Sequence, residues 1–417
     1  MLFCLHPGQN IQGQVRYPFQ NDVELRNNES TREHMIEARR QQKDVFGMKG
    51  MSVFTTIPNF DVVFGLPLDH MHAALLGVTR HIWNLIMKSD VGTYRQIIEE
   101  RYLNIKFPSS FSRQPRKFEE EAKFKASEWE HIALYCFYPC FYGFLTEDRL
   151  KHFMYFSSSL FTLLEFRISN ENLNRCDIWL KKFCARFGSL YGEINETFNV
   201  HLMTHMVETV RKQGALWNFS LFPYENGNGI LLKYRTGNNK PVLQIAKKYA
   251  LKKSCHSIPI PYNSPIKKWI DEIWRGKKMS NLLFNEHLRF VIQNEQFEDG
   301  IISREFSYHS KMTYHGIQYC TKTYCEDFRY DDSYININDK FIRITCILTD
   351  RENSIFVVGR VLKTKSIFPN LYIYKETNQK LVVKLNDSIR QCISITVEVD
   401  NESLNCICVC KFSPFVE

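Results

Sequence analysis

The sequence has no apolar run long enough to cross a membrane. Its best candidate, HIALYCFYPCFYGFL at 131–145, is short and is interrupted by Pro139. The first residues, MLFCLHPG, also lack the charged start and the apolar core of a secretory signal. We therefore expect a chain that is neither inserted in a membrane nor secreted, and we expect no membrane partner.

A regular cysteine framework is also lacking. The 13 cysteines show no repeated spacing, unlike those of a small disulfide-stapled domain. Cys406, Cys408 and Cys410 alternate with apolar residues, which favours buried thiols on one face of a strand over a shared metal ion. We expect free thiols in a reducing compartment, with a minority of the cysteines available to bind metal.

Negative charge is missing from one long stretch. The net charge of the chain is +9, and no Asp or Glu stands between Glu225 and Asp271. Two tyrosines, Tyr234 and Tyr249, are interleaved with the positive charges there. Such a basic segment favours binding to a phosphate backbone, because binding releases condensed counterions; a solvated lysine-rich linker is the alternative. The positive charges are Lys233, Arg235, Lys240, Lys247, Lys248, Lys252, Lys253, Lys267 and Lys268.

The apolar patterning predicts two kinds of structure in one chain. At 417 residues the chain is long enough for two domains. Helical patterns near 128–145, 147–168 and 171–188 precede a fourth at about 196–213, whereas alternating β-branched segments begin near 300. The expected fold is α+β, with a mainly helical N-terminal region followed by a small all-β C-terminal domain. The expected parts are an irregular segment at 1–65, a helical domain at 66–255, a basic linker and helix at 256–300, and a β-rich module at 301–417.

Two helix starts are marked by polar residues that can cap exposed amides. Asp69 precedes an apolar stripe, and with His72 it forms a D-x-x-H element; capping is the favoured role, and metal or catalytic ligation is the alternative. Ser127, three residues before Glu130, predicts a capping box at the start of the next helix.

Two histidines four residues apart, His201 and His205, lie in the fourth helical pattern. At this spacing both imidazoles leave one face of a helix, as two ligands of a first-row metal must. Buried, hydrogen-bonded core histidines are the alternative. A zinc protease of the H-E-x-x-H type needs a Glu after the first His, and Leu202 stands there, so that chemistry is excluded. A lone acidic residue, Glu225, follows in an apolar and aromatic run.

Four blocks of sequence occur in a fixed order in the first three fifths of the chain. They are CLHPG at 4–8, LPLDHMHAALLGVTRHIW at 66–83, RQPRKFEEEAKFKASEW at 113–129 and LYGEINETFNVHLMTHMVETVRKQGALWNFSLFPYENGNGIL at 190–231. In this order they resemble successive blocks of the CACTA (En/Spm-like) DNA transposase family. The resemblance implies a nuclear, DNA-binding protein whose helical part is the insertion region of an incomplete RNase H-like core.

The resemblance also implies roles for individual residues. Transposases of the DDE type hold two Mg²⁺ ions between three carboxylates, and Glu225 stands in the place of the third. Cys4, His201 and His205 would bind a structural Zn²⁺, with Met1 in the place of a fourth ligand. The family's first two catalytic aspartates precede this element, so we expect a truncated copy or a shortened gene model without strand transfer, and Mg²⁺ only in a full-length form.

Basic residues in two of these regions are the expected DNA contacts, and Asp69 and His72 match a D-x-x-H hallmark of the family. The expected contacts are Arg113, Arg116, Lys117, Lys233, Arg235, Lys247, Lys248, Lys252 and Lys253.

Three functions compete for this sequence. The first is the C-terminal fragment of a CACTA-like transposase that binds DNA without catalysing transposition. The second is a domesticated scaffold that binds nucleic acid or chromatin. The third is an unrelated single-metal hydrolase built on His201, His205 and Glu225. Assembly into a homo-oligomer is left open by the sequence.

Overall fold

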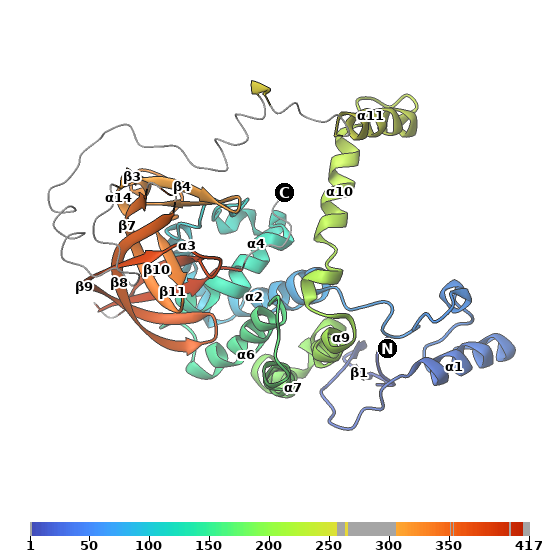
Figure 1. The fold of residues 1–417 in the computed structure, drawn as a ribbon. Coiled ribbons are helices and arrows are strands. Elements are labelled where there is room, and N and C mark those ends of the chain that lie inside the picture. The colour runs from blue at the N-terminus through green and yellow to red at the C-terminus, as the bar shows by residue number, and fades with distance from the viewer. Residues whose placement is uncertain are drawn as a thin grey trace. The chain divides into compact units, whose positions relative to one another are not determined.

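A computed structural model of the chain describes residues 2–256, 263–265, 306–350, 352, 354–399 and 402–411. They belong to two compact units, each with its own secondary structure (Figure 1). The helical unit comprises Met1–Glu99 and Glu119–Leu221, and the barrel unit comprises Glu100–Phe118 and Phe222–Glu417. Helices dominate the first unit and strands make most of the second, so the α+β fold expected from the sequence is confirmed.

The helical unit begins with a short hairpin and one helix. Strand β1 (Gln9–Ile11) pairs antiparallel with β2 (Gln14–Arg16). Helix α1 (Asn28–Gln41) is capped by the side chain of Asn27, which accepts a hydrogen bond from the Ser30 amide. The segment expected to be irregular at 1–65 therefore contains a helix of 14 residues.

A succession of helices makes up the rest of the helical unit. The stripe that follows Asp69 lies in η2 (Met71–Thr79), a π-helix that continues directly into α2 (Arg80–Met87). Of the five stripe residues that the periodicity predicts to be buried, Leu75, Val78, Ile82 and Ile86 are buried and Leu85 is half-buried. The other helices are η1 (Val53–Thr56), η3 (Asp90–Tyr94), α3 (Arg95–Leu103), η4 (Phe118–Lys123), α4 (Ala126–His131), η5 (Ile132–Cys136), α5 (Phe137–Phe141), α6 (Glu147–Leu163), α7 (Asn170–Tyr191), η6 (Glu193–Asn195), α8 (Phe198–Leu202), η7 (Met203–His205), α9 (Met206–Gln213) and η8 (Leu216–Phe219).

Aromatic side chains of α6 and α7 form the centre of the helical unit. Phe153 and Phe156 on α6 are fully buried, and so are Phe183 and Phe187 on α7. The ring centroids of Phe156 and Phe183 lie 5.3 Å apart. Burying one such side chain contributes roughly 2–3 kcal/mol, so this cluster supplies a large share of the driving force for packing the two helices together.

The start of α4 differs from the sequence prediction. The helix begins at Ala126, and the Glu128 carboxylate accepts a hydrogen bond of 2.8 Å from the amide of Lys125. Ser127 is therefore already inside the helix, beyond the position at which a side chain can cap it. The carboxyl group of Glu130 is thereby left without the capping role, and burial raises its pKa to about 7.

The barrel unit is built around a closed, barrel-like sheet. Its antiparallel order is β7–β6–β10–β11–β9–β8, and β8 pairs back with β7 to close the ring, with β3 attached to the other edge of β7. A small residue allows close packing of β8 on β7, because a Cβ on Gly359 would collide with the Arg343 carbonyl oxygen. The elements are β3 (Ser307–His309), β4 (Lys311–Tyr314), β5 (Ile317–Cys320), α14 (Lys322–Cys325), β6 (Tyr334–Ile337), β7 (Lys340–Thr349), β8 (Ile355–Phe368), β9 (Leu371–Lys384), β10 (Arg390–Val399) and β11 (Glu402–Val409).

The segment Glu100–Phe118 belongs to the barrel unit although it is distant in sequence. The fully buried carboxylate of Asp332 accepts hydrogen bonds of 2.8 Å from both the amide and the hydroxyl group of Ser109. The same carboxylate accepts from the side-chain amides of Gln318 and Gln391, at 2.8 Å and 3.0 Å. The buried charge is thus surrounded by donors, as burial of a carboxylate requires.

Cysteines of the described residues are buried free thiols in both units. Cys406, Cys408 and Cys410 at the end of β11 are each at most 4% exposed, which confirms their prediction as buried thiols.

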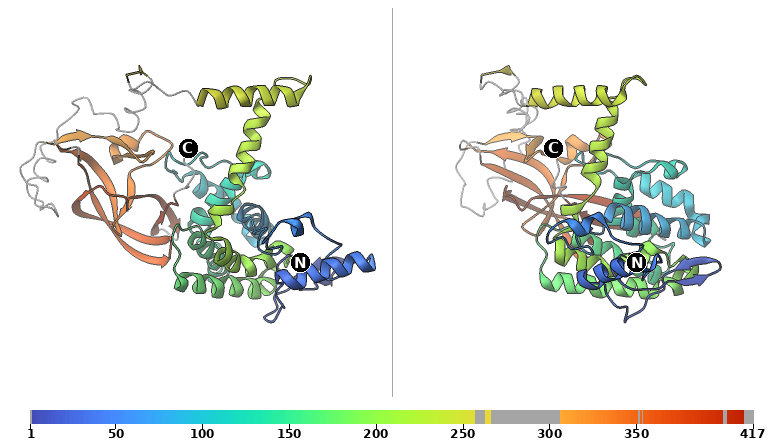
Figure 2. Two further views of the ribbon diagram at one scale, coloured as in Figure 1. Left: turned by 45° about the vertical axis from the view of Figure 1, so that its right-hand side comes forward. Right: turned by 90° about the vertical axis from the view of Figure 1, so that its right-hand side faces the viewer.

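Two further helices precede the strands. Helix α10 (Phe222–Lys233) is followed by α11 (Pro241–His256), and Figures 1 and 2 both show α11 crossing the end of α10. The residues expected to form a basic linker and helix at 256–300 lie mostly outside the described residues. Among the described helices, we find none with the length and apolar character needed to span a membrane.

Candidate metal centre and basic helix pair

Three potential metal ligands meet in the interior of the helical unit. The Sγ atom of Cys4 lies 3.3 Å from Nε2 of His201, and that nitrogen lies 3.1 Å from Nε2 of His205. All three ligand atoms lie within 4.8 Å of one another, and all three residues are buried. A tetrahedral zinc ion separates its nitrogen and sulfur ligands by roughly 3.3–3.6 Å, so these two separations are close to those that such an ion needs. Within the described part of the chain, no other cluster of this kind is found.

Each ligand is positioned by local backbone structure. Helix α8 begins after Thr197, whose carbonyl oxygen accepts from the His201 amide at 3.1 Å. The tight turn η7 then carries His205 to the start of α9. Cys4 lies on an isolated bridge to Leu25, between two backbone hydrogen bonds that join residues 3–5 to residues 24–26. The cluster therefore joins the N-terminal segment to the α8–α9 region.

A third histidine, His6, packs against this cluster and was not singled out from the sequence. Its ring centroid lies 4.9 Å from that of His201, edge to face. Its Nδ1 accepts a hydrogen bond of 2.9 Å from the Gly8 amide, so its Nε2 carries the proton and donates to the carbonyl oxygen of Pro18 at 2.8 Å. Both nitrogens are occupied, and His6 supports the cluster rather than supplying a ligand. The LHPG turn in the sequence is the signal that could have identified it.

The protonation states suit metal binding. Burial, with the neighbouring His205 and His6, lowers the pKa of His201 to about 3. Burial, with His6 and Lys181, lowers the pKa of His205 to about 4. Burial raises the pKa of the Cys4 thiol. At neutral pH the two imidazoles are therefore neutral, so each has one ring nitrogen without a proton that can bind a metal, and the thiol must release its proton when a metal binds.

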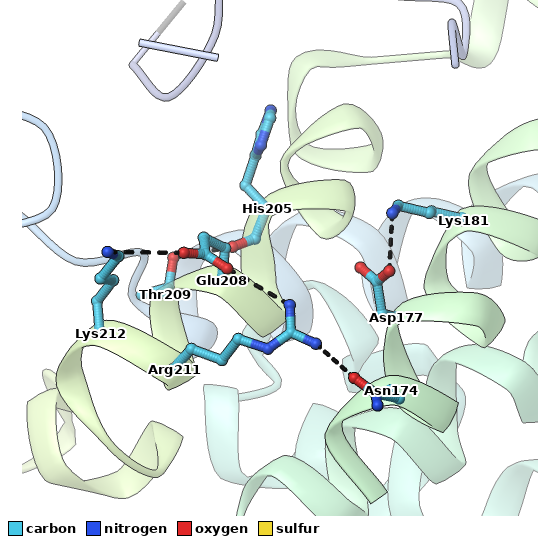
Figure 3. Close-up of polar contacts among 8 residues, drawn as sticks. All are labelled: Asn174, Asp177, Lys181, His205, Glu208, Thr209, Arg211 and Lys212. Carbon is cyan, nitrogen blue, oxygen red and sulfur yellow. Dashed lines mark hydrogen bonds and ion pairs between the residues drawn. The ribbon is translucent and has the colours of Figure 1, made fainter. Parts of the chain in front are cut away.

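The opposite face of α9 is fixed by polar contacts (Figure 3). Glu208 forms ion pairs with Arg211 and Lys212, at 3.4 Å and 4.0 Å. Arg211 also donates to the side chain of Asn174 on α7 at 2.8 Å. The His205 side chain points away from this network in Figure 3. These contacts tie α9 to α7, so they stabilise the orientation of the helix that carries His205.

The D-x-x-H element forms a cap. Oδ2 of Asp69 accepts from the His72 amide at 2.9 Å and lies 2.6 Å from His72 Nδ1. Oδ1 of Asp69 accepts from the Leu221 amide at 3.1 Å. Both carboxylate oxygens are thus engaged in the first turn of η2 and in holding Leu221, which agrees with the favoured capping role. Neither residue belongs to the metal-ligand cluster.

Glu225 lies in the first turn of α10 and is exposed. It belongs to the barrel unit, whereas Cys4, His201 and His205 belong to the helical unit. The structure therefore gathers the cysteine and two histidines in one cluster and does not include Glu225 in it.

The basic residues expected to contact DNA all belong to the barrel unit. Arg113 and Lys117 are exposed, and Arg116 is half-buried. The described residues 226–256 contain no Asp or Glu, and most of their positive side chains are exposed. The seven positive residues of this helix pair, α10 with α11 and their connection, are Lys233, Arg235, Lys240, Lys247, Lys248, Lys252 and Lys253.

A groove of 590 Å³ lies between α10 and α11. It is lined by three tyrosines and two lysines together with small and apolar residues. These residues are Pro223, Tyr224, Gly227, Asn228, Ile230, Leu231, Tyr234, Tyr249, Lys252 and Lys253.

Compared with protein-family models, with curated proteins and with solved structures, the chain finds no match in any of the three. The fold and the two sites define the chain only as an α+β protein with a buried Cys/His/His cluster and a basic helix pair.

Proposed function

We propose that this chain is a DNA-binding protein derived from a CACTA-like transposase, acting in the nucleus through its basic helix pair. The observation that carries the proposal is the charge of residues 226–256, which hold seven positive side chains and no negative one. Lysine and arginine in this number on two adjoining helices match the repeated negative charge of a phosphate backbone. Arg113, Arg116 and Lys117 extend the proposed contacts within the same unit.

In this proposal the helical unit corresponds to the insertion region of an RNase H-like core, and a structural Zn²⁺ stabilises it. Cys4, His201 and His205 would hold the ion. With an ion at Nε2 of His201, the ring proton would be on Nδ1, which is buried and has no hydrogen-bond partner among the described residues. The ion would fix the N-terminal segment against α8 and α9.

Strand transfer by this chain is not part of the proposal. A two-metal DDE site needs three carboxylates, and the chain supplies Glu225 as the only one that the resemblance assigns. Mg²⁺ would serve only a form that carries the other two acids. A domesticated DNA- or chromatin-binding scaffold makes the same use of the helix pair and is the alternative.

The single-metal hydrolase receives little support. The cluster contains Cys4 in place of Glu225, and its three residues are each at most 7% exposed. A catalytic zinc keeps one position open to water and substrate, whereas this burial suits a structural ion.

The test is the salt dependence of DNA binding. We expect affinity for duplex DNA to fall steeply as the salt concentration rises from about 50 to 200 mM. Replacing Lys247, Lys248, Lys252 and Lys253 by Gln should reduce the slope of log K against log salt by about 3 to 4, because each phosphate contact contributes about 0.9. Fluorescence anisotropy with a labelled duplex measures both quantities.

The matched control removes the same charge from exposed lysines elsewhere, by replacing Lys43, Lys151, Lys182 and Lys363 by Gln. If the slope of log K against log salt falls by the same amount in both quadruple variants, net charge rather than the helix pair governs binding. An affinity that does not respond to salt would refute the proposed function.

A further inference from the structure

We infer that the groove between α10 and α11 binds unpaired bases, so that the helix pair prefers single-stranded nucleic acid over duplex. This inference rests on the proposed function, because it specifies which form of nucleic acid the same helices bind. It is carried by the side chains that line the groove rather than by charge alone.

Three aromatic rings line one groove. Tyr224 and Tyr234 come from α10 and the residue that follows it, and Tyr249 comes from α11. Tyr224 is 70% exposed and Tyr249 is 51% exposed, so neither ring serves as core. Exposed aromatic rings in a groove provide flat surfaces on which bases stack, and stacking is tolerant of sequence because every base has a π face.

Positive charge lies beside these rings. Lys252 and Lys253, one turn beyond Tyr249 on α11, also line the groove. Tyrosines that contact bases and lysines that contact the connecting phosphates form the combination found in proteins that bind single strands. A base paired inside a duplex hides both of its faces by stacking on its neighbours, so the rings of the groove cannot reach them. The volume of 590 Å³ falls within the range of sites that enclose small organic ligands.

The connection between α10 and α11 is fixed by hydrogen bonds. Oε1 of Gln244 accepts hydrogen bonds from the amides of Thr236 and Gly237, at 2.8 Å and 3.2 Å. Its Nε2 donates to the carbonyl oxygen of Asn239 at 2.5 Å. One side chain of α11 thus fastens the connection from α10, and Pro241 starts the second helix at its first position. A site arranged before binding loses less entropy when the ligand arrives.

Charge also decides against a second copy of this chain as the occupant. Two such grooves facing each other would bring together two helix pairs that each carry seven positive residues and no negative one between 226 and 256. Like charges at this density repel, whereas a polyanion is attracted.

The experiment compares a short single-stranded oligonucleotide with a duplex of the same length, by fluorescence anisotropy at one salt concentration. We expect the single strand to bind more tightly. Replacing Tyr234 and Tyr249 by Leu should weaken single-strand binding by about 5- to 150-fold for each stacked base lost and should leave duplex binding nearly unchanged. Leu preserves apolar contact and removes the ring. Tyr94→Leu, an exposed tyrosine of the helical unit, is the control and should change neither affinity.

A second readout detects stacking directly. A fluorescent adenine analogue placed within the single strand loses emission when it stacks on an aromatic ring. We expect quenching with the native protein and with Tyr94→Leu, weaker quenching with the double Tyr234/Tyr249 variant, and none when Tyr224 is also replaced by Leu.

The outcomes separate the two proposals. The inference is overturned if the protein binds duplex DNA through its lysines and gives no quenching, or if the tyrosine substitutions do not change single-strand binding. Either result leaves the proposed function standing. Absence of binding to either form overturns both. A tyrosine-dependent dimer of the free protein, detected by light scattering, would show that a second copy fills the groove and would overturn the inference.

Discussion

Acid should destabilise the helical unit, because it buries four histidines in their neutral form. Burial, as the largest cause, lowers the pKa of His201 to about 3 and those of His70, His152 and His205 to about 4. In the unfolded chain the same imidazoles return to a pKa of about 6.5. The unfolded state therefore binds more protons at every pH between these values. Stability from these groups is fully present above pH 6.5 and is lost progressively as the pH falls toward about 4.

The size of the effect follows from the pKa values. When the pH falls from about 7.5 to about 5.5, each histidine lowers the free energy of unfolding by roughly 1.3 kcal/mol, and the four together lower it by about 5 kcal/mol. Glu130 acts in the opposite direction: burial raises its pKa to about 7, so protonation of the folded state restores roughly 2 kcal/mol over the same range. The expected net loss is about 3 kcal/mol, which is a large part of the roughly 5–15 kcal/mol by which a typical domain is stable.

Urea unfolding followed by tryptophan fluorescence measures this loss, in buffer with a chelator so that metal binding does not contribute. Trp83 and Trp129 are buried in the helical unit, so their emission reports its unfolding; Trp269 and Trp274 of the barrel unit lie outside the described residues and are replaced by Phe for this assay. The free energy of unfolding at pH 5.5 should be lower than that at pH 7.5 by about 3 kcal/mol. Equal unfolding free energies at both values would refute the reasoning.

One variant isolates a single histidine. The His152 ring stacks on Phe183 with centroids 4.5 Å apart, so His152→Phe keeps the packing and cannot take up a proton. It loses the hydrogen bond from Nε2 to the Phe183 carbonyl oxygen and should be less stable at pH 7.5, yet its pH dependence should be smaller by roughly 1.3 kcal/mol. His315→Phe, at an exposed site in the barrel unit, is the control and should leave the pH dependence unchanged.

Two further predictions concern the interiors of the two units. Asp332→Ala should destabilise the barrel unit by about 3–5 kcal/mol in thermal or urea unfolding, because it leaves the buried donors of Ser109, Gln318 and Gln391 without their acceptor. A loss of less than about 1 kcal/mol would contradict this reasoning. Co²⁺ added to metal-free protein should give the ultraviolet charge-transfer absorption of a cobalt–thiolate bond and should release one proton from Cys4 at neutral pH. The Cys4→Ser variant should lack this absorption. If the native protein lacks it as well, the cluster is not a metal site.

The sequence identifies part of the candidate site and misses the rest for a physical reason. His201 and His205 could be paired from their spacing, since a helix places such residues on one face. Cys4 entered the prediction only through the family resemblance, because a contact between residues 197 positions apart leaves no periodic signal. His6 was missed because its place depends on a turn that directs both ring nitrogens to backbone groups.

The same distinction holds for the fold. Alternating β-branched residues predict the long strands, and burial along β7 follows that alternation in part. Strands β7 and β8 are neighbours along the chain, whereas the pairing of β10 with β6, which brings Arg390 opposite Asn336, is a long-range choice that alternation cannot encode. Capping was predicted correctly at Asp69 and wrongly at Ser127: the N-cap residue is Lys125, and Glu128 rather than Glu130 accepts from its amide.

The membership of Glu100–Phe118 in the barrel unit has a consequence for how the protein can be divided. This segment is made before the second half of the helical unit, yet Ser109 bonds to Asp332, 223 residues later. A protein cut after Leu221 would keep the segment and lose the side chains of Asp332 and Gln391, which bind Ser109 and Ser110. Cutting the polypeptide at the unit boundary therefore cannot yield two intact units, and synthesis of the whole chain must precede completion of the second.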